Sequence, residues 1–369
     1  MMAGVLVHEW IAQEGGSENV LQAMGETFPD AEMLCLWNQS TGRFDPARVR
    51  ESWLARTPLR HHKALALPLM PATWRFLDYR GYDWALISSH AFAHHARFRG
   101  APHGFRRMVY VHTPARYVWT PDFDARGDNP AARFASYGLR PLDRRRAKEG
   151  AEFAANSAFV RRRIRIAWGV DARVIYPPVD VERIQSVPDW RDRLTPTEST
   201  ILEALPDGFL LGASRFIPYK RLEEVIRVGE AAGRPVVLAG RGPSLPVLQE
   251  AAAGVDVPVH FVHAPSKALL YALYQQTSLF VFPAVEDFGI MPVEAMAAGA
   301  PVLARDEGGA AESVVPGRTG SLIGFASAGE IREGVDVAMS TDRSQRTARA
   351  RDFGAKRFRD EITAWVGER

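Results

Sequence analysis

The chain alternates short apolar runs with segments of helical spacing along most of its length. Runs such as residues 5–7 and 85–87 lack helical spacing, which is typical of strands buried on both faces of a parallel sheet. Strands that alternate with amphipathic helices build parallel sheets with helices on both sides. The pattern therefore predicts an α/β fold.

The expected strands form two series, separated by Pro177-Pro178, a pair that forces an extended crossover. The first series comprises residues 5–7, 31–36, 85–87, 108–111, 153–155 and 173–176, and the second comprises residues 209–214, 235–240, 259–263, 279–283 and 301–305. The length of 369 residues also exceeds the ~250–300 residues at which single cores stop growing. We expect two doubly wound domains, at residues 1–178 and 179–350, followed by a helix at about 351–369.

The stretch Leu279–Val302 carries two carboxylates, Glu286 and Glu294, around a predicted strand-to-helix connection. The apolar run LFVF predicts a buried strand, and a loop from 284 to 290 follows it. Pro292 suits the first turn of a helix, so Glu294 is expected in that turn, with Gly299 as its terminator. Ligands bind at the carboxyl ends of strands in such sheets, where helix amides also point.

Other candidate residues follow the predicted strands of the second series. Arg215 and Lys220 come after the strand FLLGAS, where two cations could bind an anionic ligand. Gly240 and Gly242 follow PVVLAG in a G-x-G pattern, which lacks the third glycine and the downstream acid of a dinucleotide fingerprint.

Glycines and polar residues also follow strands of the first series. Gly15 and Gly16 lie between the first strand and a helix, where glycine lets a ligand approach the backbone. His112 ends the strand RMVYVH, and Asn156-Ser157 follows the strand EFAA. A lone Gly-Gly pair is commonly just a turn, and a lone histidine beside a strand more often has a structural role than a catalytic one.

Taken together, these motifs resemble the retaining glycosyltransferases of family 4, which have the two-domain GT-B architecture. The resemblance covers most of the chain, is strongest at 208–320 and is weakest at 40–105. It implies two Rossmann-like domains facing a cleft, with the acceptor bound by residues 1–178 and the donor by 179–350. It also implies that the last helix packs back on the first domain.

The resemblance assigns a role to each candidate residue. Glu286 would face the transferred sugar, and Glu294 would hold the nucleotide ribose. Backbone amides of the loop residues Phe288, Gly289 and Ile290 would contact sugar hydroxyls. The remaining roles are a diphosphate clamp by Arg215 and Lys220, contact with the nucleotide or its phosphates by Gly15, Gly16, Gly240 and Gly242, a position under the sugar for His112, and weaker sugar or acceptor contacts by Asn156 and Ser157.

The segments EDFGI, MPVEA and HTPARYVW look most like those of bacterial mannosyltransferases that use GDP-mannose. They imply transfer of mannose, with retention, to a glycan or a polyprenyl-diphosphate-linked acceptor in surface polysaccharide synthesis. A UDP-sugar donor with a small soluble acceptor is the alternative. A sugar-nucleotide epimerase or a non-catalytic membrane adaptor would fit the same architecture, although the intact set of site residues speaks against both.

Charge and composition bear on partners and location. Residues 1–180 carry 25 Lys and Arg against 18 Asp and Glu, so a basic first half could face an anionic membrane or acceptor. We expect no nucleic-acid partner, because no recognised binding module accompanies the charge. We expect a cytoplasmic location, either free or at the inner face of the membrane. The sequence has no apolar run of ~20 residues, one cysteine and no signal-peptide pattern.

No metal or other cofactor is expected, because the two cations after the strand FLLGAS would serve the leaving diphosphate. A metal would need paired carboxylates, and the one candidate is the D-F-D motif at Asp122 and Asp124. This motif lies in a loop rich in turn residues instead of directly after a buried strand.

Overall fold

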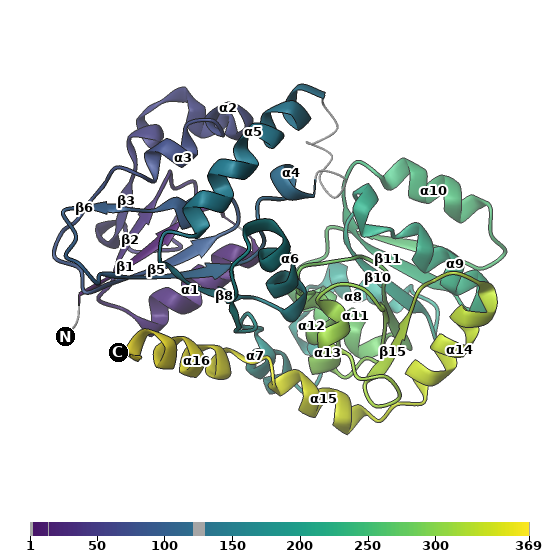
Figure 1. Cartoon of the computed structure of the whole chain (residues 1–369). Coiled ribbons are helices and arrows are strands. Elements are labelled where there is room, and N and C mark those ends of the chain that lie inside the picture. The colour runs from purple at the N-terminus through teal and green to yellow at the C-terminus, as the bar shows by residue number, and fades with distance from the viewer. Residues whose placement is uncertain (1–2, 14, 121–129, 369) are drawn as a thin grey trace. The chain divides into compact units, whose positions relative to one another are not determined.

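Two large parallel sheets organise the chain in a computed structural model (Figure 1). The structure describes residues 3–13, 15–120 and 130–368, with the backbone alone for residues 130–137. It divides into two units, one comprising residues 1–178 and 356–369 and the other residues 179–355. Each unit is built around one of the sheets.

In the described residues, the sheet of the first unit has seven strands in the order β3-β2-β1-β5-β7-β8-β9, all paired in parallel. Its strands are β1 (Gly4–His8), β2 (Glu32–Cys35), β3 (Val49–Glu51), β5 (Trp84–Ser89), β7 (Arg106–Val111), β8 (Glu152–Ala155) and β9 (Arg173–Val174). The expected strands of the first series all occur, and β3 is an additional edge strand.

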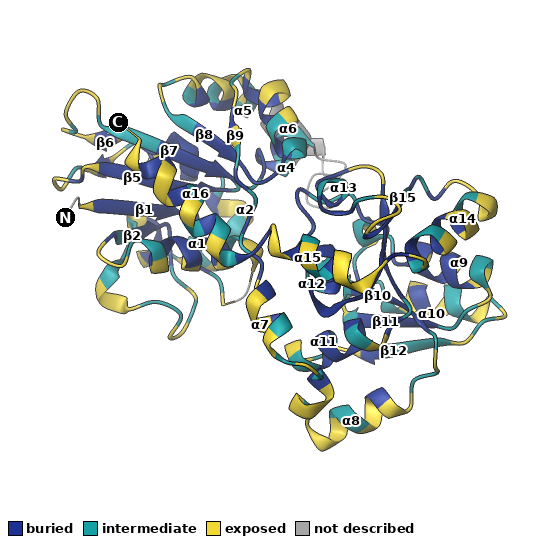
Figure 2. Cartoon of the chain, turned by 90° about the horizontal axis from the view of Figure 1, so that it is seen from below, coloured by how far each residue is buried: buried dark blue, intermediate teal, exposed yellow. Residues whose placement is uncertain are grey.

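Side chains of the strands alternate between two cores, one on each face of this sheet. Val5 and Val7 pack into one core, while Leu6 between them packs into the other. This period of two is the geometry of a strand, and full burial on both faces explains the continuous apolar runs. The central strands are accordingly buried throughout in Figure 2.

Helices cover both faces of the first sheet. They are α1 (Gly16–Thr27), α2 (Lys63–Ala66), α3 (Met70–Thr73), α4 (Arg116–Trp119), α5 (Pro130–Ala147), α6 (Ala158–Trp168) and α16 (Ala355–Gly367). The last helix contributes Phe358, Ile362 and Trp365 to the same core as α1, and Figure 1 shows it beside α1. The i, i+4, i+7 spacing of these three residues places them on one helical face.

The final helix begins at Ala355, a few residues later than the sequence pattern predicts. Phe353, which shares the helical spacing, lies in the second unit and packs against Phe288 with ring centroids 5.6 Å apart. A turn at Phe353–Gly354 separates α16 from the preceding helix, because the backbone there pairs with Val179 instead of continuing the helix.

The region between β3 and β7 adds small elements around β5 that the sequence pattern did not predict. A separate two-stranded parallel sheet joins β4 (Leu77–Asp78) to β6 (Phe98–Arg99). Short 3-10 helices at Trp53–Arg56, Pro58–His61 and Ala93–His95 accompany it. These pieces are too short to have a recognisable apolar period.

In the described residues, the sheet of the second unit has six parallel strands in the order β12-β11-β10-β13-β14-β15. They are β10 (Leu210–Arg215), β11 (Val236–Arg241), β12 (Val259–His263), β13 (Leu279–Phe282), β14 (Val302–Arg305) and β15 (Gly320–Ile323). The five expected strands occur, and β15 was missed because two apolar residues between glycines give too weak a pattern.

Helices also surround the second sheet. They are α7 (Val181–Ser186), α8 (Pro196–Glu203), α9 (Glu223–Ala232), α10 (Leu245–Ala253), α11 (Lys267–Gln276), α12 (Ile290–Ala298), α13 (Ala310–Ser313), α14 (Ala328–Met339) and α15 (Arg343–Arg351). A 3-10 turn at Pro218–Lys220 precedes α9, and another spans Trp190–Arg193.

Both sheets reverse their strand order next to their first strand. In the first unit this switch point lies between β1 and β5, and in the second it lies between β10 and β13. Ligands of open α/β sheets bind at the carboxyl ends of the strands beside such a point. The two switch points are therefore the places to look for functional side chains.

Candidate functional site

Lys220 and Glu286 form an ion pair at the switch point of the second sheet. Lys220 ends the 3-10 turn that follows β10, and Glu286 lies in the loop that follows β13. Both side chains are mostly buried, at 11% and 16% exposure, so water screens the pair only weakly. The structure thus brings together a cation and a carboxylate that the sequence had marked separately.

Arg215, at the end of β10, contributes a second cation on the same side of the sheet. Its guanidinium is exposed and donates a hydrogen bond to the Tyr219 hydroxyl at 3.2 Å. The Lys220 ammonium lies 5.1 Å from the centroid of the Tyr219 ring. The tyrosine therefore links the two cations, and Arg215 remains accessible to an anionic ligand.

The loop that carries Glu286 is held by residues at and shortly after the end of β14. The Arg305 Nε donates to the Pro283 carbonyl at 2.8 Å, and the Gly309 amide donates to the Glu286 carbonyl at 2.7 Å. A Cβ at Gly309 would lie 2.2 Å from the Asp287 carbonyl oxygen, so only glycine fits there. The backbone around Glu286 is consequently held from two sides.

Gly289 makes the turn from this loop into α12. Its φ of 87° is in the left-handed region, and no side chain caps the helix that begins at Ile290. The loop therefore ends one residue earlier than predicted. Phe288 is buried and Gly289 is the N-cap, so the three loop residues expected to contact a sugar stand at the amino end of α12.

Because α12 begins at Ile290, Glu294 is its fifth residue and lies beyond the predicted first turn. Burial raises the pKa of Glu294 to about 7, Lys267 opposes this rise, and Asp180 adds to it. Burial is the main cause of the raised pKa values of Tyr271 and Tyr274, and the charge of Glu294 raises both further. A carboxyl with this pKa can change its charge near neutral pH.

Gly240 and Gly242 lie at the end of β11, beside the end of β10. A Cβ at Gly240 would come within 1.8 Å of the Ser214 carbonyl oxygen, and one at Gly242 within 2.4 Å of the Phe216 carbonyl oxygen. Both glycines are required by the close approach of two backbones next to Arg215. Their predicted contact with the nucleotide stays a prediction.

In the first unit, the switch point holds a chain of three polar side chains from three strands. Ser88 Oγ lies 3.0 Å from His8 Nδ1 and 2.8 Å from His112 Nε2. His8 ends β1, Ser88 belongs to β5, and His112 directly follows β7. Since a hydroxyl has one proton, Ser88 donates to one ring and accepts from the other.

The two histidines of this chain differ in their surroundings. His8 is buried, and its desolvation lowers its pKa to about 3, so its ring is neutral at physiological pH. His112 is half-buried and therefore closer to solvent. Ser88 fixes the orientation of the His112 ring, whose expected place under the sugar stays a prediction.

The remaining candidates of the first unit have clear structural roles. Gly15 precedes α1, and a Cβ there would lie 2.1 Å from an oxygen of Glu18. Ser157 is the N-cap of α6, where its hydroxyl accepts from the Val160 amide at 3.0 Å. Asn156 is buried and accepts a hydrogen bond from the Ser157 hydroxyl at 3.3 Å. Gly16 is the first residue of α1. The ligand contacts expected of these four residues stay predictions.

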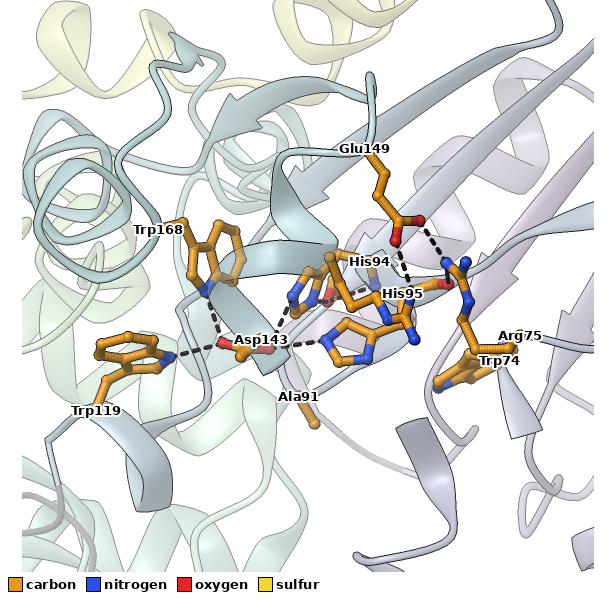
Figure 3. A network of polar contacts seen from close by, with 12 residues as sticks. Trp74, Arg75, Ala91, His94, His95, Trp119, Asp143, Glu149 and Trp168 are labelled. Carbon is orange, nitrogen blue, oxygen red and sulfur yellow. Dashed lines mark hydrogen bonds and ion pairs between the residues drawn. The ribbon is translucent and has the colours of Figure 1, made fainter. Parts of the chain in front are cut away.

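Figure 3 shows a buried network around Asp143, a residue of α5. One carboxylate oxygen lies 3.0 and 2.9 Å from the Nε2 atoms of His94 and His95. The other accepts the indole N–H groups of Trp119 and Trp168, both at 2.7 Å. Burial raises the pKa of Asp143, but the contacts with His94 and His95 outweigh it and lower the pKa; the pKa of His95 is lowered to about 4, chiefly by burial.

The atoms of His94, His95 and Asp143 lie close enough together to hold a metal ion. However, one carboxylate oxygen of Asp143 already accepts the two indole N–H groups, and the other lies within hydrogen-bond distance of His95 Nε2. The observed distances therefore correspond to a hydrogen-bonded network. The other metal candidates, Asp122 and Asp124, lie outside the described residues.

Two family profiles match the chain, one over most of the first unit and the other over most of the second. The profile of "Glycosyltransferase Family 4" matches residues 14–183, and that of "Glycosyl transferases group 1" matches residues 200–356. The chain consists of two glycosyltransferase domains. The switch-point residues Lys220 and Glu286 lie in the group 1 domain. Of the three hydrogen-bonded side chains of the first unit, Ser88 and His112 lie in the family 4 domain.

Solved glycosyltransferase structures confirm the predicted GT-B fold class. Anabaena HepE in complex with UDP has a TM-score of 0.68 at 17% identity, with 99% of each chain covered. Sucrose-phosphate synthase from Thermosynechococcus elongatus has a TM-score of 0.69 at 16% identity and covers 99% of this chain and 98% of that one. At these identities the likeness is one of fold.

Curated relatives of the glycosyltransferase domains include mannosyltransferases. The chain is 32% identical over 185 residues to a GDP-mannose-dependent alpha-(1-6)-phosphatidylinositol monomannoside mannosyltransferase of Mycolicibacterium smegmatis, a match covering 45% of this chain and 47% of the relative. It is 40% identical over 86 residues to an alpha-1,3/1,6-mannosyltransferase of Neurospora crassa, covering 23% and 18%. The chain thus spans about half or less of these relatives.

Several neighbours of the candidate sites in the two glycosyltransferase domains were not found from the sequence. His8 and Ser88 in the first domain, and Arg305 and Gly309 in the second, all lie at or just after the carboxyl ends of strands. Recording every polar or glycine residue at the end of each predicted strand would have identified them. In the described ranges 3–13, 15–120 and 130–368, no helix is long and apolar enough to span a bilayer.

Proposed function

We propose that the chain is a retaining hexosyltransferase that moves mannose from GDP-mannose to a glycan or polyprenyl-diphosphate-linked acceptor in surface polysaccharide synthesis. The ion pair between Lys220 and Glu286, beside Arg215 at the switch point of the second sheet, is the observation that carries this proposal. It supplies cations for a leaving diphosphate and a carboxylate for a sugar in one place.

The chemistry assigned to these residues follows from their charges. Arg215 and Lys220 stabilise the negative charge that develops on the departing diphosphate. Glu286, released from Lys220, accepts hydrogen bonds from the sugar hydroxyls and orients the ring. The acceptor hydroxyl attacks the anomeric carbon on the face from which the diphosphate leaves, and a phosphate oxygen takes up its proton.

Glu294 and His112 have further proposed roles in binding the substrates. Glu294 binds the nucleotide ribose, helped by its position in α12 beside the loop that carries Glu286. His112 contacts a sugar hydroxyl from the first domain, with its ring held by Ser88. Because the two cations neutralise the diphosphate, we propose that transfer needs no metal, which assays with and without a chelator would test.

The choice of mannose rests on the curated relatives, since the one from Mycolicibacterium smegmatis is named as GDP-mannose-dependent. A thermal-shift screen with GDP-, UDP- and ADP-sugars tests it directly. Binding to the native state alone stabilises it by about 2.7 kcal/mol at a ligand concentration of one hundred times Kd. A rise in melting temperature with a UDP-sugar alone would show that the donor is a UDP-sugar and not GDP-mannose. NMR of the product would show whether the anomeric configuration is retained.

We further propose that the protein works in the cytoplasm at the inner face of the membrane, with the first domain as the contact. The side chains of Trp53, Leu65 and Phe76 are 54–66% exposed in a stretch that also carries Lys63 and Arg56. Apolar and basic groups together suit an anionic bilayer surface. Co-sedimentation with vesicles tests this contact, and we expect no binding to nucleic acid.

A further inference from the structure

An open groove with basic walls lies over α4 and α5 in the first domain. Its volume is about 870 Å³, and its lining includes Trp119, Arg140, Arg144, Arg145, Lys148 and Glu149. This volume falls in the range of small-molecule sites. The groove is lined by Trp119 of α4, by residues of α5 and by Lys148 and Glu149 just after α5. Lys220 and Glu286, in contrast, lie in segments that follow strands of the second sheet.

Two arginines of the groove are positioned on an aromatic ring. The guanidinium carbons of Arg140 and Arg144 lie 5.5 and 5.4 Å from the centroid of Trp119. The Nε of Arg140 donates to the Val118 carbonyl at 2.8 Å, and the Nε of Arg144 donates to the Ala167 carbonyl at 2.9 Å. Both guanidinium groups are thus held in place before any ligand arrives, which reduces the entropy that binding would cost.

Trp119, which lines the groove, is anchored in the core of the first domain. The indole N–H of Trp119 donates to the buried carboxylate of Asp143, which His94, His95 and Trp168 also contact (Figure 3). Asp143 lies between Arg140 and Arg144 on α5 but faces inward. Helix α5 therefore both anchors the Trp119 ring, through Asp143, and supplies the cations around that ring.

Positive charge exceeds negative charge in the groove. Glu149 is the anionic residue among the described ones that line it, and its carboxylate is engaged by Arg75 at 2.5 Å and by Arg146 at 2.7 Å. These contacts lower the pKa of Glu149 despite its partial burial. Arg145 and Lys148 are both exposed, so four cations line a groove whose carboxylate is already neutralised.

We propose that this groove is a binding site for a phosphate or diphosphate group, distinct from the donor site. Guanidinium groups bind phosphate oxygens through paired charge-assisted hydrogen bonds, and a lysine adds a compact charge. The exposed Arg145 and Lys148 reach the ligand first, and Arg144 binds it from its fixed position on the ring. The phosphate is carried either by a soluble molecule, such as a phosphorylated acceptor, or by the headgroup of an anionic lipid.

Calorimetry with inorganic pyrophosphate tests the site in the full-length protein. The measurement uses an R215A/K220A background, so that the cations of the proposed donor site do not contribute. Adding R145E/K148E reverses two exposed charges of the groove, and we expect at least about a tenfold weaker binding of pyrophosphate, since charge-assisted contacts are lost at both positions. Binding should also weaken as salt is added.

Two controls separate this site from a general effect of charge or folding. R193E/R332E makes the same change in net charge at two exposed arginines of the second domain and should leave pyrophosphate binding within about twofold, because distant exposed charges are screened. R145K/K148R keeps both charges and should retain binding within about threefold. Equal binding by R145E/K148E and R193E/R332E would overturn the proposal, as would the absence of pyrophosphate binding in the background protein.

Vesicles identify the source of the phosphate. Phosphatidylcholine vesicles with and without phosphatidylglycerol are compared for R145E/K148E and R193E/R332E. Loss of both pyrophosphate and vesicle binding in R145E/K148E assigns the groove to a lipid headgroup, and loss of pyrophosphate binding alone assigns it to a soluble phosphorylated molecule. Loss of binding to a single-stranded oligonucleotide with unchanged pyrophosphate binding would overturn the proposal in favour of an extended polyanion.

Discussion

Lys220 and Glu286 are 66 residues apart in the chain and form an ion pair across the switch point of the second sheet. Each residue follows one of two neighbouring strands, β10 and β13, so the sheet brings them together. In the proposed reaction, a nucleotide sugar separates them, because the diphosphate takes the lysine and the sugar takes the carboxylate. The pair thus holds both groups near their working positions before the donor binds.

Lys220 is expected to contribute directly to the rate of sugar transfer. Lys220→Ala should lower kcat for sugar transfer by about 10²–10³-fold, the usual effect of removing one group that stabilises developing charge. Lys356→Ala removes an exposed lysine paired with Asp360 and should leave kcat unchanged. Turnover assays with circular dichroism as a folding check measure both. Wild-type turnover in folded Lys220→Ala would refute the proposed site.

Glu294 should make stability depend on pH. Its folded pKa of about 7 lies above its ordinary value of 4.5, so the folded state holds the proton more tightly than the unfolded state. Stability from this group is complete below about pH 4.5 and is lost as the pH rises through about 7, by at most about 3 kcal/mol. Urea unfolding at about pH 5 and about pH 8 should show a larger loss for wild type than for Glu294→Gln. An equal loss in both would contradict the raised pKa.

Two buried histidines should act in the opposite direction. Burial lowers the folded pKa of His95 to about 4 and that of His8 to about 3, below the ordinary 6.5. The unfolded state therefore binds protons first as the pH falls from 6.5, and each histidine costs about 2 kcal/mol of stability at pH 5. His95→Gln should reduce this acid loss by roughly half, as measured by urea unfolding at about pH 7 and pH 5. An unchanged acid loss would rule out His95 as a cause.

Ser88 should matter for both stability and the placement of His112. Ser88→Ala leaves the His8 and His112 nitrogens without the hydroxyl between them, so unfolding free energy should fall by about 1–3 kcal/mol. If His112 contacts the sugar, kcat should fall as well. Ser340→Ala, which removes an exposed hydroxyl bond in the second domain, is the comparison and should change neither quantity by much. A wild-type kcat in Ser88→Ala would show that the His112 orientation is not needed.

Gly309 tests how tightly the loop of Glu286 is held. A Cβ in Gly309→Ala would meet the Asp287 carbonyl oxygen at 2.2 Å, so the loop must shift, at a cost of about 1–3 kcal/mol. Donor affinity should weaken by about tenfold or more, as measured by calorimetry with the nucleotide sugar. The Cβ in Gly254→Ala would make only an ordinary contact, 3.6 Å from the Ala251 carbonyl oxygen, so this variant should retain wild-type affinity. Unchanged affinity in Gly309→Ala would mean that the loop adapts freely.

The sequence predicted the sheets well because their strands are buried on both faces. Four of the six described strands in the second sheet, β10, β11, β13 and β14, contain continuous apolar runs, and such runs need no partner to be recognised. It missed β15, where Gly320–Ile323 has too few apolar residues, and β3, a polar edge strand at Val49–Glu51. These strands form because β14 and β2 offer them backbone hydrogen bonds, which leave no trace in composition.

Site residues were found where a motif marked them and missed where only position mattered. Glu286, Lys220 and His112 belong to segments with a recognisable pattern, and all three lie at switch points. The start of α12 was misplaced by one residue, because the left-handed turn at Gly289 moves Ile290 into the helix. His8 and Ser88 carry no motif and became visible only when three strands aligned their ends.

Local periodicity and residue chemistry were enough to predict the α/β class, the two series of strands and the charged candidate residues. Which of those charges meet depends on how the strands and helices are arranged in space. Lys220 faces Glu286, Ser88 joins His8 to His112, and Asp143 holds Trp119 under the arginines, since strand order and helix packing set distances between residues far apart in the chain. The pKa of Glu294 likewise follows from burial, which no single segment specifies.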